Sequence, residues 1–277
     1  MYWHSFSGSG GVLSRVEQLA LTSFVKTGFT VRLFHYHPVF NVPKGVELCD
    51  ARDVLAEDKI FYTESPSGRS PANFSDVFRY AMLQKYGGWW FDMDVVSLKP
   101  AKNWPLRSLP TFASTFEGEW GECASNCCIF MPSANHPIAD LLLNTALERQ
   151  KNEKRDFCDL GPFLVQHVVK NNDMTHVASY EEFCPYPWRI IDMLVYKTLK
   201  GRTLNLLRAM KHAVRQHSRS DFKMGRIQKN TLAIHLHNEI FMQKGIDKNG
   251  QYHPACGLEK LYRRFEVIPV MSDTVKP

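Results

Sequence analysis

Two aspartates separated by one residue, Asp92 and Asp94, are the densest group of potential ligands in the sequence. They follow Trp89, Trp90 and Phe91, an aromatic run that is typical of a β-strand. In extended backbone alternate side chains share one face, so both carboxylates can converge on one ligand. Two anionic oxygens at this spacing suit a divalent cation such as Mn²⁺ or Mg²⁺. An isolated D-x-D is more often a surface turn, so the surrounding sequence decides whether this pair is expected to bind a metal.

Asp76 and Arg79 lie three residues apart within residues 73–86, where apolar side chains recur at helical spacing until Gly87 and Gly88. Residues three apart on a helix face the same way. One interpretation is an exposed ion pair worth under about 1 kcal/mol. The other is a carboxylate for sugar hydroxyls beside a guanidinium for hydroxyls or phosphate. The spacing leaves both interpretations open.

The N-terminal part of the chain alternates predicted strands and helices. Residues 2–6 are a short aromatic run before the glycine-rich turn at 7–11, and residues 29–36 are rich in β-branched and aromatic side chains. Between them, Ser14 and Glu17 have capping-box spacing at the start of an amphipathic segment. Strand, helix, strand in this order predicts a parallel pair in an α/β sheet. The aspartate pair then falls at the carboxyl edge of a sheet, where such folds bind ligands.

The composition sets bounds on the class of protein. The chain has 277 residues, 44% hydrophobic and 22% charged, which suits a self-supporting core and excludes disordered, collagen-like and coiled-coil classes. It lacks an apolar stretch of the roughly 20 residues that a membrane span needs, and its first residues do not resemble a signal peptide. The seven cysteines therefore predict reduced thiols, and Cys123, Cys127 and Cys128 lack the C-x-x-C spacing of a zinc site.

The positive charge is concentrated in one segment. The formal net charge is +6, but residues 196–229 hold ten basic residues and one acidic one, which leaves −3 for the rest. The segment includes an amphipathic pattern over residues 203–217. Because the sequence shows no repeat or clear linker, we expect a single domain over residues 1–277 with a basic helical excursion near 190–230.

Residues 74–100 resemble the signature of the glycosyltransferases that contain the DXD sugar-binding motif: a helix carrying S-D-x-x-R, then two glycines, then D-x-D. The likeness is to the bacterial branch, related to fungal initiating α-1,6-mannosyltransferases, lactosylceramide α-1,4-galactosyltransferases and clostridial glucosylating toxins. Further matching residues extend it over most of residues 1–265: Leu13, Ser14, Ser23, Phe24, Gly28, residues 31–36, Asp50, Ala51, Gly161, Pro162 and residues 235–239.

This resemblance implies a GT-A fold, a Rossmann-like single domain in which we expect a mixed, mostly parallel central sheet. It implies that Asp94 binds Mn²⁺ directly and that Asp92 contacts the ribose and donor sugar and reaches the metal through water. Asp76 and Arg79 correspond to the pair that grips donor-sugar hydroxyls. His235 corresponds to a late metal or diphosphate contact, and imidazole suits Mn²⁺ better than Ca²⁺. The related families retain anomeric configuration.

Several further positions have two interpretations each. Trp3 and Phe6, at the end of the first predicted strand, either stack on the nucleotide base or pack in the core. Asn126 either lies near the donor sugar, as the resemblance implies, or forms a turn. Trp90 stands where the family often has tyrosine, and His237 where it has tryptophan, so the donor pocket is expected to differ in detail.

On the acceptor side we expect Asp159 and Gly161. The basic segment from Lys197 to Lys229 is interpreted as a solvated helix face, an acceptor-phosphate site or a contact with an anionic membrane surface. Nucleic acid is not expected, because a recognition module and stacking aromatics are missing. These features predict a cytoplasmic protein, and under the membrane interpretation one that binds peripherally to the inner face of the cell membrane.

The leading hypothesis is a metal-dependent, retaining hexosyltransferase. It would move a hexose from a nucleotide diphosphate sugar, with a UDP-sugar favoured, to a glycan, lipid-linked or glycolipid acceptor in cell-surface polysaccharide synthesis. Alternatives are a protein-modifying glycosyltransferase, a sugar-nucleotide hydrolase and a non-catalytic sugar-nucleotide or glycan-binding protein. A hydrolytic glycosidase is disfavoured, because its carboxylates usually flank the bond from opposite sides while Asp92 and Asp94 share one segment.

Overall fold

The computed structural model describes residues 1–117, 121–152, 156–195 and 225–269, so most of the predicted basic excursion lies outside the described residues. Short 3-10 helices cover Ala51–Asp53, Glu57–Lys59, Ala101–Asn103 and Trp188–Leu194. The described α-helices are α1 (Arg15–Lys26), α2 (Ala72–Tyr86), α3 (Pro137–Gln150), α4 (Pro162–Lys170), α5 (Tyr180–Phe183), α7 (Asn238–Gln243) and α8 (Gly257–Phe265).

The described strands form one larger sheet and several two-stranded ones. They are β1 (Gly11–Val12), β2 (Val31–His35), β3 (Val39–Phe40), β4 (Val46–Asp50), β5 (Thr63–Ser65), β6 (Gly68–Ser70), β7 (Gly88–Phe91), β8 (Val95–Ser97), β9 (Thr111–Phe116), β10 (Glu122–Met131), β11 (His176–Val177) and β12 (Ala233–His235).

The expected mixed α/β class is confirmed, but the larger sheet is not mostly parallel. Its order is β11-β9-β10-β7, and β10 runs antiparallel to both of its neighbours while β11 is parallel to β9. The linker of residues 117–121 between β9 and β10 is too short for the crossover that a parallel pair requires. Parallel pairing is found instead in β2–β4 and β1–β3.

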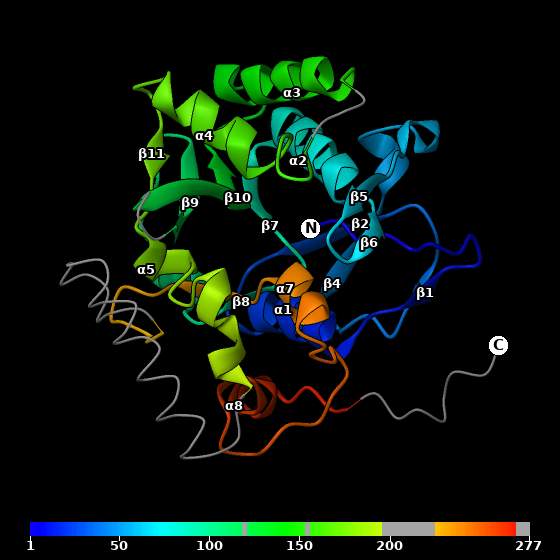
Figure 1. Cartoon of the computed structure of the whole chain (residues 1–277), viewed down its shortest axis with the longest axis vertical. Coiled ribbons are helices and arrows are strands. Elements are labelled where there is room, and N and C mark those ends of the chain that lie inside the picture. The colour runs from blue at the N-terminus through cyan, green and yellow to red at the C-terminus, as the bar shows by residue number, and fades with distance from the viewer. Residues whose placement is uncertain (118–120, 153–155, 196–224, 270–277) are drawn as a thin grey trace.

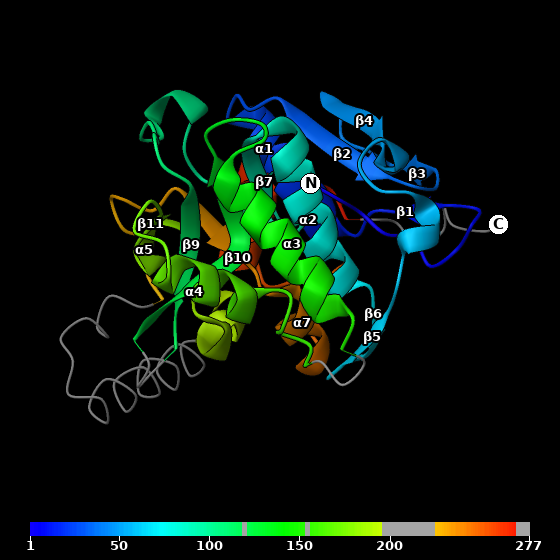
Figure 2. The same cartoon turned by 90° about the horizontal axis from the view of Figure 1, so that it is seen from above.

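The helices lie on two sides of these strands. Figure 1 shows α2, α3 and α4 together on one side of β7, β10 and β9, with α1 and α8 toward the opposite end of the molecule. Figure 2 shows the same three helices lying across the sheet when it is seen from above. α3 packs on α2 and α4, α4 contacts β10, and α1 packs on β8 and α8. In the part of the chain that is described, none of the helices has the length and apolar character needed to cross a membrane.

Local sequence signals predicted two helices that hold the site. Ser14 caps α1 by accepting a hydrogen bond from the Glu17 N–H, and the Glu17 carboxylate accepts one from the Ser14 N–H. α2 ends at Gly87, whose φ of 65° is a conformation that glycine adopts without strain. The strand predicted over residues 2–6 is reduced to one parallel bridge between Tyr2 and Phe34.

Three apolar clusters meet around the D-x-D segment. Trp90 belongs to the cluster beneath α2 and α3, Phe91 and Val95 to the cluster beneath α1, and Val96 to the cluster shared by α1 and α8. All four side chains are at most 5% exposed. The turn that carries the aspartates is therefore anchored in the core on both sides, which fixes its backbone.

A buried ion pair joins α1 to α8. The guanidinium of Arg15, 2% exposed, donates to the two carboxylate oxygens of Glu259 at 3.0 and 2.8 Å and lies 3.7 Å above the ring of Tyr262. Burial alone would raise the pKa of Glu259, but hydrogen bonds from Arg15 and from the Tyr252 N–H hold it below its ordinary value. The pair thus links the start of α1 to α8.

We predict that Glu259→Gln lowers the free energy of unfolding by about 3–5 kcal/mol at neutral pH, because it leaves the Arg15 charge buried without its partner. The folded-state pKa of Glu259 is lowered, so its stabilisation is present above the unfolded pKa and is lost as pH falls through the folded pKa. Urea denaturation at neutral and acidic pH measures both effects.

The matched control is Glu47→Gln, which breaks the exposed pair between Arg32 and Glu47 and is expected to cost under about 1 kcal/mol. Equal losses for the two variants would contradict the prediction. A loss of unfolding free energy in Glu259→Gln that stays constant as the pH falls would also contradict it.

Candidate functional site

The two aspartates lie in a tight turn between strands of different sheets. β7 ends at Phe91 and pairs with β10, whereas β8 begins at Val95 and pairs with β12. The Val95 N–H donates to the Asp92 carbonyl at 3.1 Å and closes the turn. The prediction that extended backbone presents the two carboxylates was therefore wrong. They converge because the chain turns as it passes from one sheet to the next.

β12 brings His235 to the same place. It pairs antiparallel with β8 so that His235 lies opposite Val95, and its Nε2 is 3.3 Å from the Asp94 carboxylate. The Asn238 N–H donates to the other Asp94 oxygen at 2.7 Å. Burial alone would raise the pKa of Asp94, but His235 and the Asn238 N–H hold it below its ordinary value. Burial of His235 opposes a charge on its ring, but the Asp94 carboxylate and Cys127 raise the pKa of His235 well above its ordinary value. Asp94 is therefore held as a carboxylate beside a charged ring.

Arg79 connects the predicted helix pair to the D-x-D turn. Its guanidinium lies 2.9 Å from Asp92 and 3.2 Å from Asp76, and it donates to the Asn126 carbonyl at 2.7 Å. It is 4% exposed, so the alternative of an exposed Asp76–Arg79 pair is excluded. Asn126 Nδ2 also donates to Asp76 at 2.8 Å. Helix α2, strand β10 and the D-x-D turn are thus joined by one buried cation.

Two carboxyl groups around Arg79 are unusually basic. Burial raises the pKa of Asp76 to about 7 and that of Asp92 to about 6, although the Arg79 charge opposes both shifts. Two carboxylates share one guanidinium here, so each also raises the cost of ionising the other. An added positive charge in this site would relieve that repulsion.

Gly161 lies against the same carboxyl group. A methyl group on Gly161 would approach Asn126 Nδ2 to 2.8 Å and Asp76 Oδ2 to 2.9 Å, so the start of α4 can come this close only with glycine there. Gly161 thus lies with the predicted donor residues. The Asp159 side chain accepts a hydrogen bond from the Asp156 N–H at 2.6 Å, and this contact belongs to a local turn.

The aromatic side chains predicted to lie near the donor differ in their exposure to solvent. Trp90 is 1% exposed and its Nε1 donates to Asp92 at 2.7 Å, so it positions that carboxylate. Trp3 is partly buried against the core, which favours the packing interpretation. Phe6 is 68% exposed and stacks on Tyr62 with ring centroids 5.8 Å apart. Tyr62, which the sequence did not single out, is also 3.9 Å from the Arg69 guanidinium.

His237, where the family has tryptophan, has a left-handed backbone with φ of 53°. Its ring lies 4.0 Å from that of His235. Burial and the neighbouring His235 lower its pKa to about 3. The sequence also missed the Asn238 N–H as a partner of Asp94, although Asn238 falls in the run 235–239 that carried part of the resemblance. His237 is therefore a neutral ring packed beside a potential ligand.

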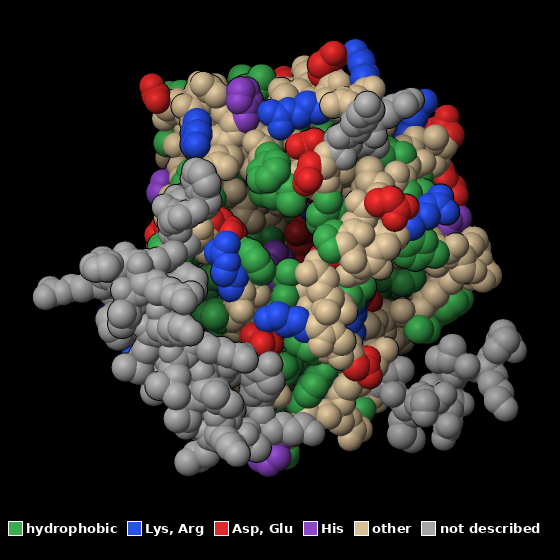
Figure 3. Space-filling view, viewed as in Figure 1, with side chains coloured by type: hydrophobic (Ala, Val, Ile, Leu, Met, Phe, Trp, Pro, Cys, Tyr) green, Lys and Arg blue, Asp and Glu red, His purple; other side chains and the backbone are tan. Residues whose placement is uncertain are grey.

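The donor set fits a divalent cation. One ligand atom from each of Asp92, Asp94 and His235 lies within 4.8 Å of the others. Asp92 is 24% exposed at the side chain and Asp94 is 7%, so the group can be reached from one side. Figure 3 shows a hollow near the centre of this face with acidic and histidine atoms at its floor. Two carboxylates and one imidazole are ligands that suit Mn²⁺ or Mg²⁺.

Comparison with known proteins agrees with this geometry. Residues 31–109 match the family model for the glycosyltransferase sugar-binding region containing the DXD motif. Over these residues the chain is similar to glycosyltransferases of the DXD type. This region includes Asp76, Arg79, Asp92 and Asp94, while Asn126 and His235 reach the site from later parts of the chain.

The whole chain is also similar to a solved structure. The structure titled "PaToxG Glycosyltransferase" is similar over 98% of this chain and 88% of that chain, with 13% sequence identity and a TM-score of 0.40. None of the curated proteins matches the sequence.

We predict that Arg79→Met destabilises the sugar-binding region by at least about 3–5 kcal/mol, because two buried carboxyl groups lose their common counter-charge. Urea denaturation at neutral pH measures the change. The matched control is Arg32→Met, which removes a guanidinium from an exposed pair and is expected to cost about 1 kcal/mol or less. A loss in Arg79→Met no larger than in the control would contradict the role given to Arg79.

Proposed function

We propose that this glycosyltransferase is metal-dependent and transfers a hexose from a nucleotide diphosphate sugar, with a UDP-sugar as the favoured donor. The observation that carries the proposal is the convergence of Asp92, Asp94 and His235 beside the buried Asp76–Arg79 pair. A diphosphate leaving group gains negative charge as the glycosidic bond breaks, and a cation held at these carboxylates supplies the stabilising charge.

The residues around the proposed metal site have separable roles. Asp94, Asp92 and His235 would hold the cation, and Arg79 and Trp90 orient the Asp92 carboxylate. Asp76 and Asn126, held together at 2.8 Å, offer a carboxyl group and an amide to sugar hydroxyls. The exposed ring of Phe6, backed by Tyr62, offers a stacking surface for the base. The residues proposed to recognise the donor and those proposed to stabilise the leaving group would thus lie on one face of the molecule.

We further propose that the transfer retains anomeric configuration by front-face attack. The acceptor hydroxyl forms the new bond to the anomeric carbon on the face from which the diphosphate leaves, and a donor phosphate oxygen takes the hydroxyl proton. This follows from the resemblance to retaining families and from the engagement of Asp76 and Asp92 with Arg79. A glycosyl-enzyme intermediate trapped on a carboxylate would contradict it.

For the acceptor we propose a glycan, lipid-linked or glycolipid molecule in cell-surface polysaccharide synthesis. A protein acceptor and simple hydrolysis of the donor are the alternatives within the same chemistry. Attraction to an anionic membrane stays a prediction from the sequence, because residues 196–224 lie outside the described part of the chain. The remaining alternative is a non-catalytic sugar-nucleotide or glycan-binding protein. Turnover measurements distinguish it from an enzyme.

The test is a panel of UDP- and GDP-sugars, each assayed with and without Mn²⁺ for release of the nucleoside diphosphate. We expect one donor to support Mn²⁺-dependent turnover, and Asp94→Asn to reduce that turnover by about 100-fold or more, since it removes a metal ligand.

Asp58→Asn, which alters an exposed carboxylate paired with Lys59, is the matched control and is expected to keep full activity. Turnover that does not need metal, or full activity in Asp94→Asn, would overturn the metal-dependent assignment. Donor binding without any turnover across the panel and suitable acceptors would favour the non-catalytic alternative.

A further inference from the structure

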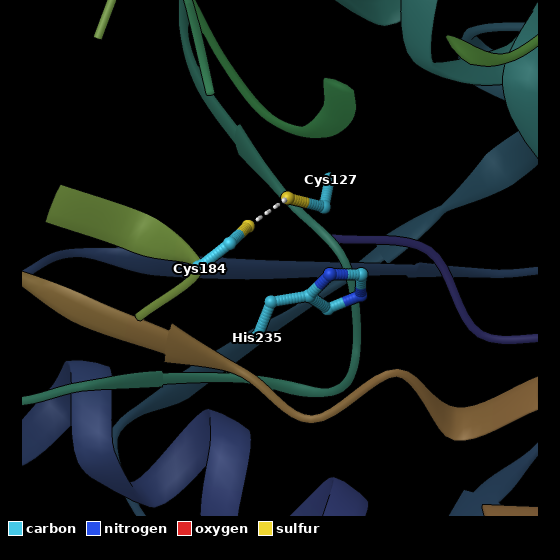
Figure 4. Close-up of side chains that lie close together, drawn as sticks. All are labelled: Cys127, Cys184 and His235. Atoms are coloured by element: carbon cyan, nitrogen blue, oxygen red, sulfur yellow. Dashed lines mark hydrogen bonds between the residues drawn. The ribbon is translucent and has the colours of Figure 1, made fainter. Parts of the chain in front are cut away.

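Two cysteines that are distant in the sequence meet behind the aspartate pair. Cys127 lies in β10, and Cys184 follows α5 directly. Their sulfur atoms are 3.8 Å apart, and both side chains are at most 1% exposed. Figure 4 shows the His235 ring beside the two sulfurs, so three segments of the chain converge there. None of this is visible in the cysteine spacing of the sequence.

The distances match those of a bound thiophilic cation. One ligand atom from each of Cys127, Cys184 and His235 lies within 4.8 Å of the others. Zn–S bonds of about 2.3 Å in a tetrahedral site separate two sulfurs by about 3.8 Å, which equals the separation in the structure. A disulfide would need the sulfurs at about 2.05 Å. The thiols therefore have the spacing of two ligands of one ion.

A second observation points to a ligand at the same place. The His235 ring contacts the Cys127 thiol, and its Nδ1 is buried without a hydrogen bond of good geometry to any described residue. Its other nitrogen, Nε2, faces the Asp94 carboxylate at 3.3 Å. A hydrogen bond from Nε2–H to Asp94 leaves Nδ1 as the nitrogen that can bind a metal once it has released any proton that it carries. Carboxylate, histidine and metal in this order form the arrangement that orients histidine ligands in zinc sites.

The charges also balance. Two thiolates and a neutral imidazole neutralise one Zn²⁺, so the buried group would carry no net charge. Binding releases two protons in total from the two cysteines and the histidine, and it involves no change of oxidation state. Sulfur ligands select zinc over Mn²⁺ and Mg²⁺, which prefer the oxygens of Asp92 and Asp94. The thiol site and the carboxylate site are thus expected to prefer different metal ions, because sulfur is a softer ligand than oxygen.

We propose that Cys127, Cys184 and His235 form a binding site for a thiophilic divalent cation, with Zn²⁺ as the ion that fits best, in addition to the metal site of the proposed transferase. A neutral imidazole has one lone pair, so His235 serves either the thiols or the carboxylates at a given time. A zinc-loaded chain therefore holds Asp94 as the hydrogen-bond partner of His235. The three protein ligands leave a fourth coordination position open.

The test titrates the full chain, purified reduced and free of metal, with Zn²⁺ against a chromophoric chelator. We expect one zinc per chain in the wild type and a loss of affinity of about 100-fold or more in Cys184→Ser. The matched control is Cys123→Ser, which changes another cysteine of β10 and is expected to bind zinc as the wild type does. Zinc binding by Cys184→Ser equal to the wild type would overturn the proposal.

Co²⁺ substitution gives a readout that does not depend on a variant folding. The wild-type chain is expected to show the intense near-ultraviolet band of thiolate-to-cobalt charge transfer. Co²⁺ binding without that band would overturn the proposal, as would a Cys127–Cys184 disulfide, detected by mass, that forms in preference to metal binding.

Measuring zinc binding and turnover on the same wild-type chain separates this site from the proposed function, and Asp94→Asn tests the contact between the two. This variant is expected to keep the thiolate band while zinc affinity falls by about 10- to 100-fold, because Asp94 orients His235. Its Mn²⁺-dependent turnover is expected to be lost independently. Failure of zinc binding with intact turnover would refute this site alone, and metal-independent turnover with intact zinc binding would refute the metal-dependent transferase alone.

Discussion

The site depends on one buried guanidinium. Arg79 holds Asp76 on its own helix and Asp92 in the turn that follows β7, and it binds the Asn126 carbonyl of β10. A guanidinium has enough donors in a fixed plane to bind several acceptors at once, which an ammonium group cannot do in the same geometry. Around this cation burial raises the pKa of both carboxyl groups, and further positive charge would favour their ionised forms.

The second constraint is the change of sheet between Asp92 and Asp94. β7 is held by β10, and β8 is held by β12, so the two aspartates lie at the joint between two separately anchored ladders. The same pairing places His235 opposite Val95 and beside Asp94. Because Trp90, Phe91, Val95 and Val96 are buried in three different clusters, the joint cannot move without disturbing the core. Ordinary packing of the core therefore holds the proposed metal ligands in place.

Local signals made part of this structure predictable. The capping box at Ser14 and the apolar spacing before Gly87 each involve a few neighbouring residues, and they correctly predicted α1 and α2. The residue types and spacing of Asp76, Arg79, Asp92 and Asp94 predicted sugar and metal chemistry, and this stays a prediction. The pattern could not show that the D-x-D lies in a turn, because this depends on the pairing of Val95 with His235. The meeting of Cys127 with Cys184 is likewise set by tertiary contacts.

The central claim is that Asp92 and Asp94 bind a divalent cation together with a nucleoside diphosphate. Electron paramagnetic resonance of Mn²⁺ titrated into the protein tests it directly, with and without UDP or GDP. We expect one bound Mn²⁺ per chain whose affinity rises when the matching diphosphate is present, and we expect this Mn²⁺ to be lost in Asp94→Asn. Mn²⁺ binding that ignores both diphosphates, or that survives unchanged in Asp94→Asn, would contradict it.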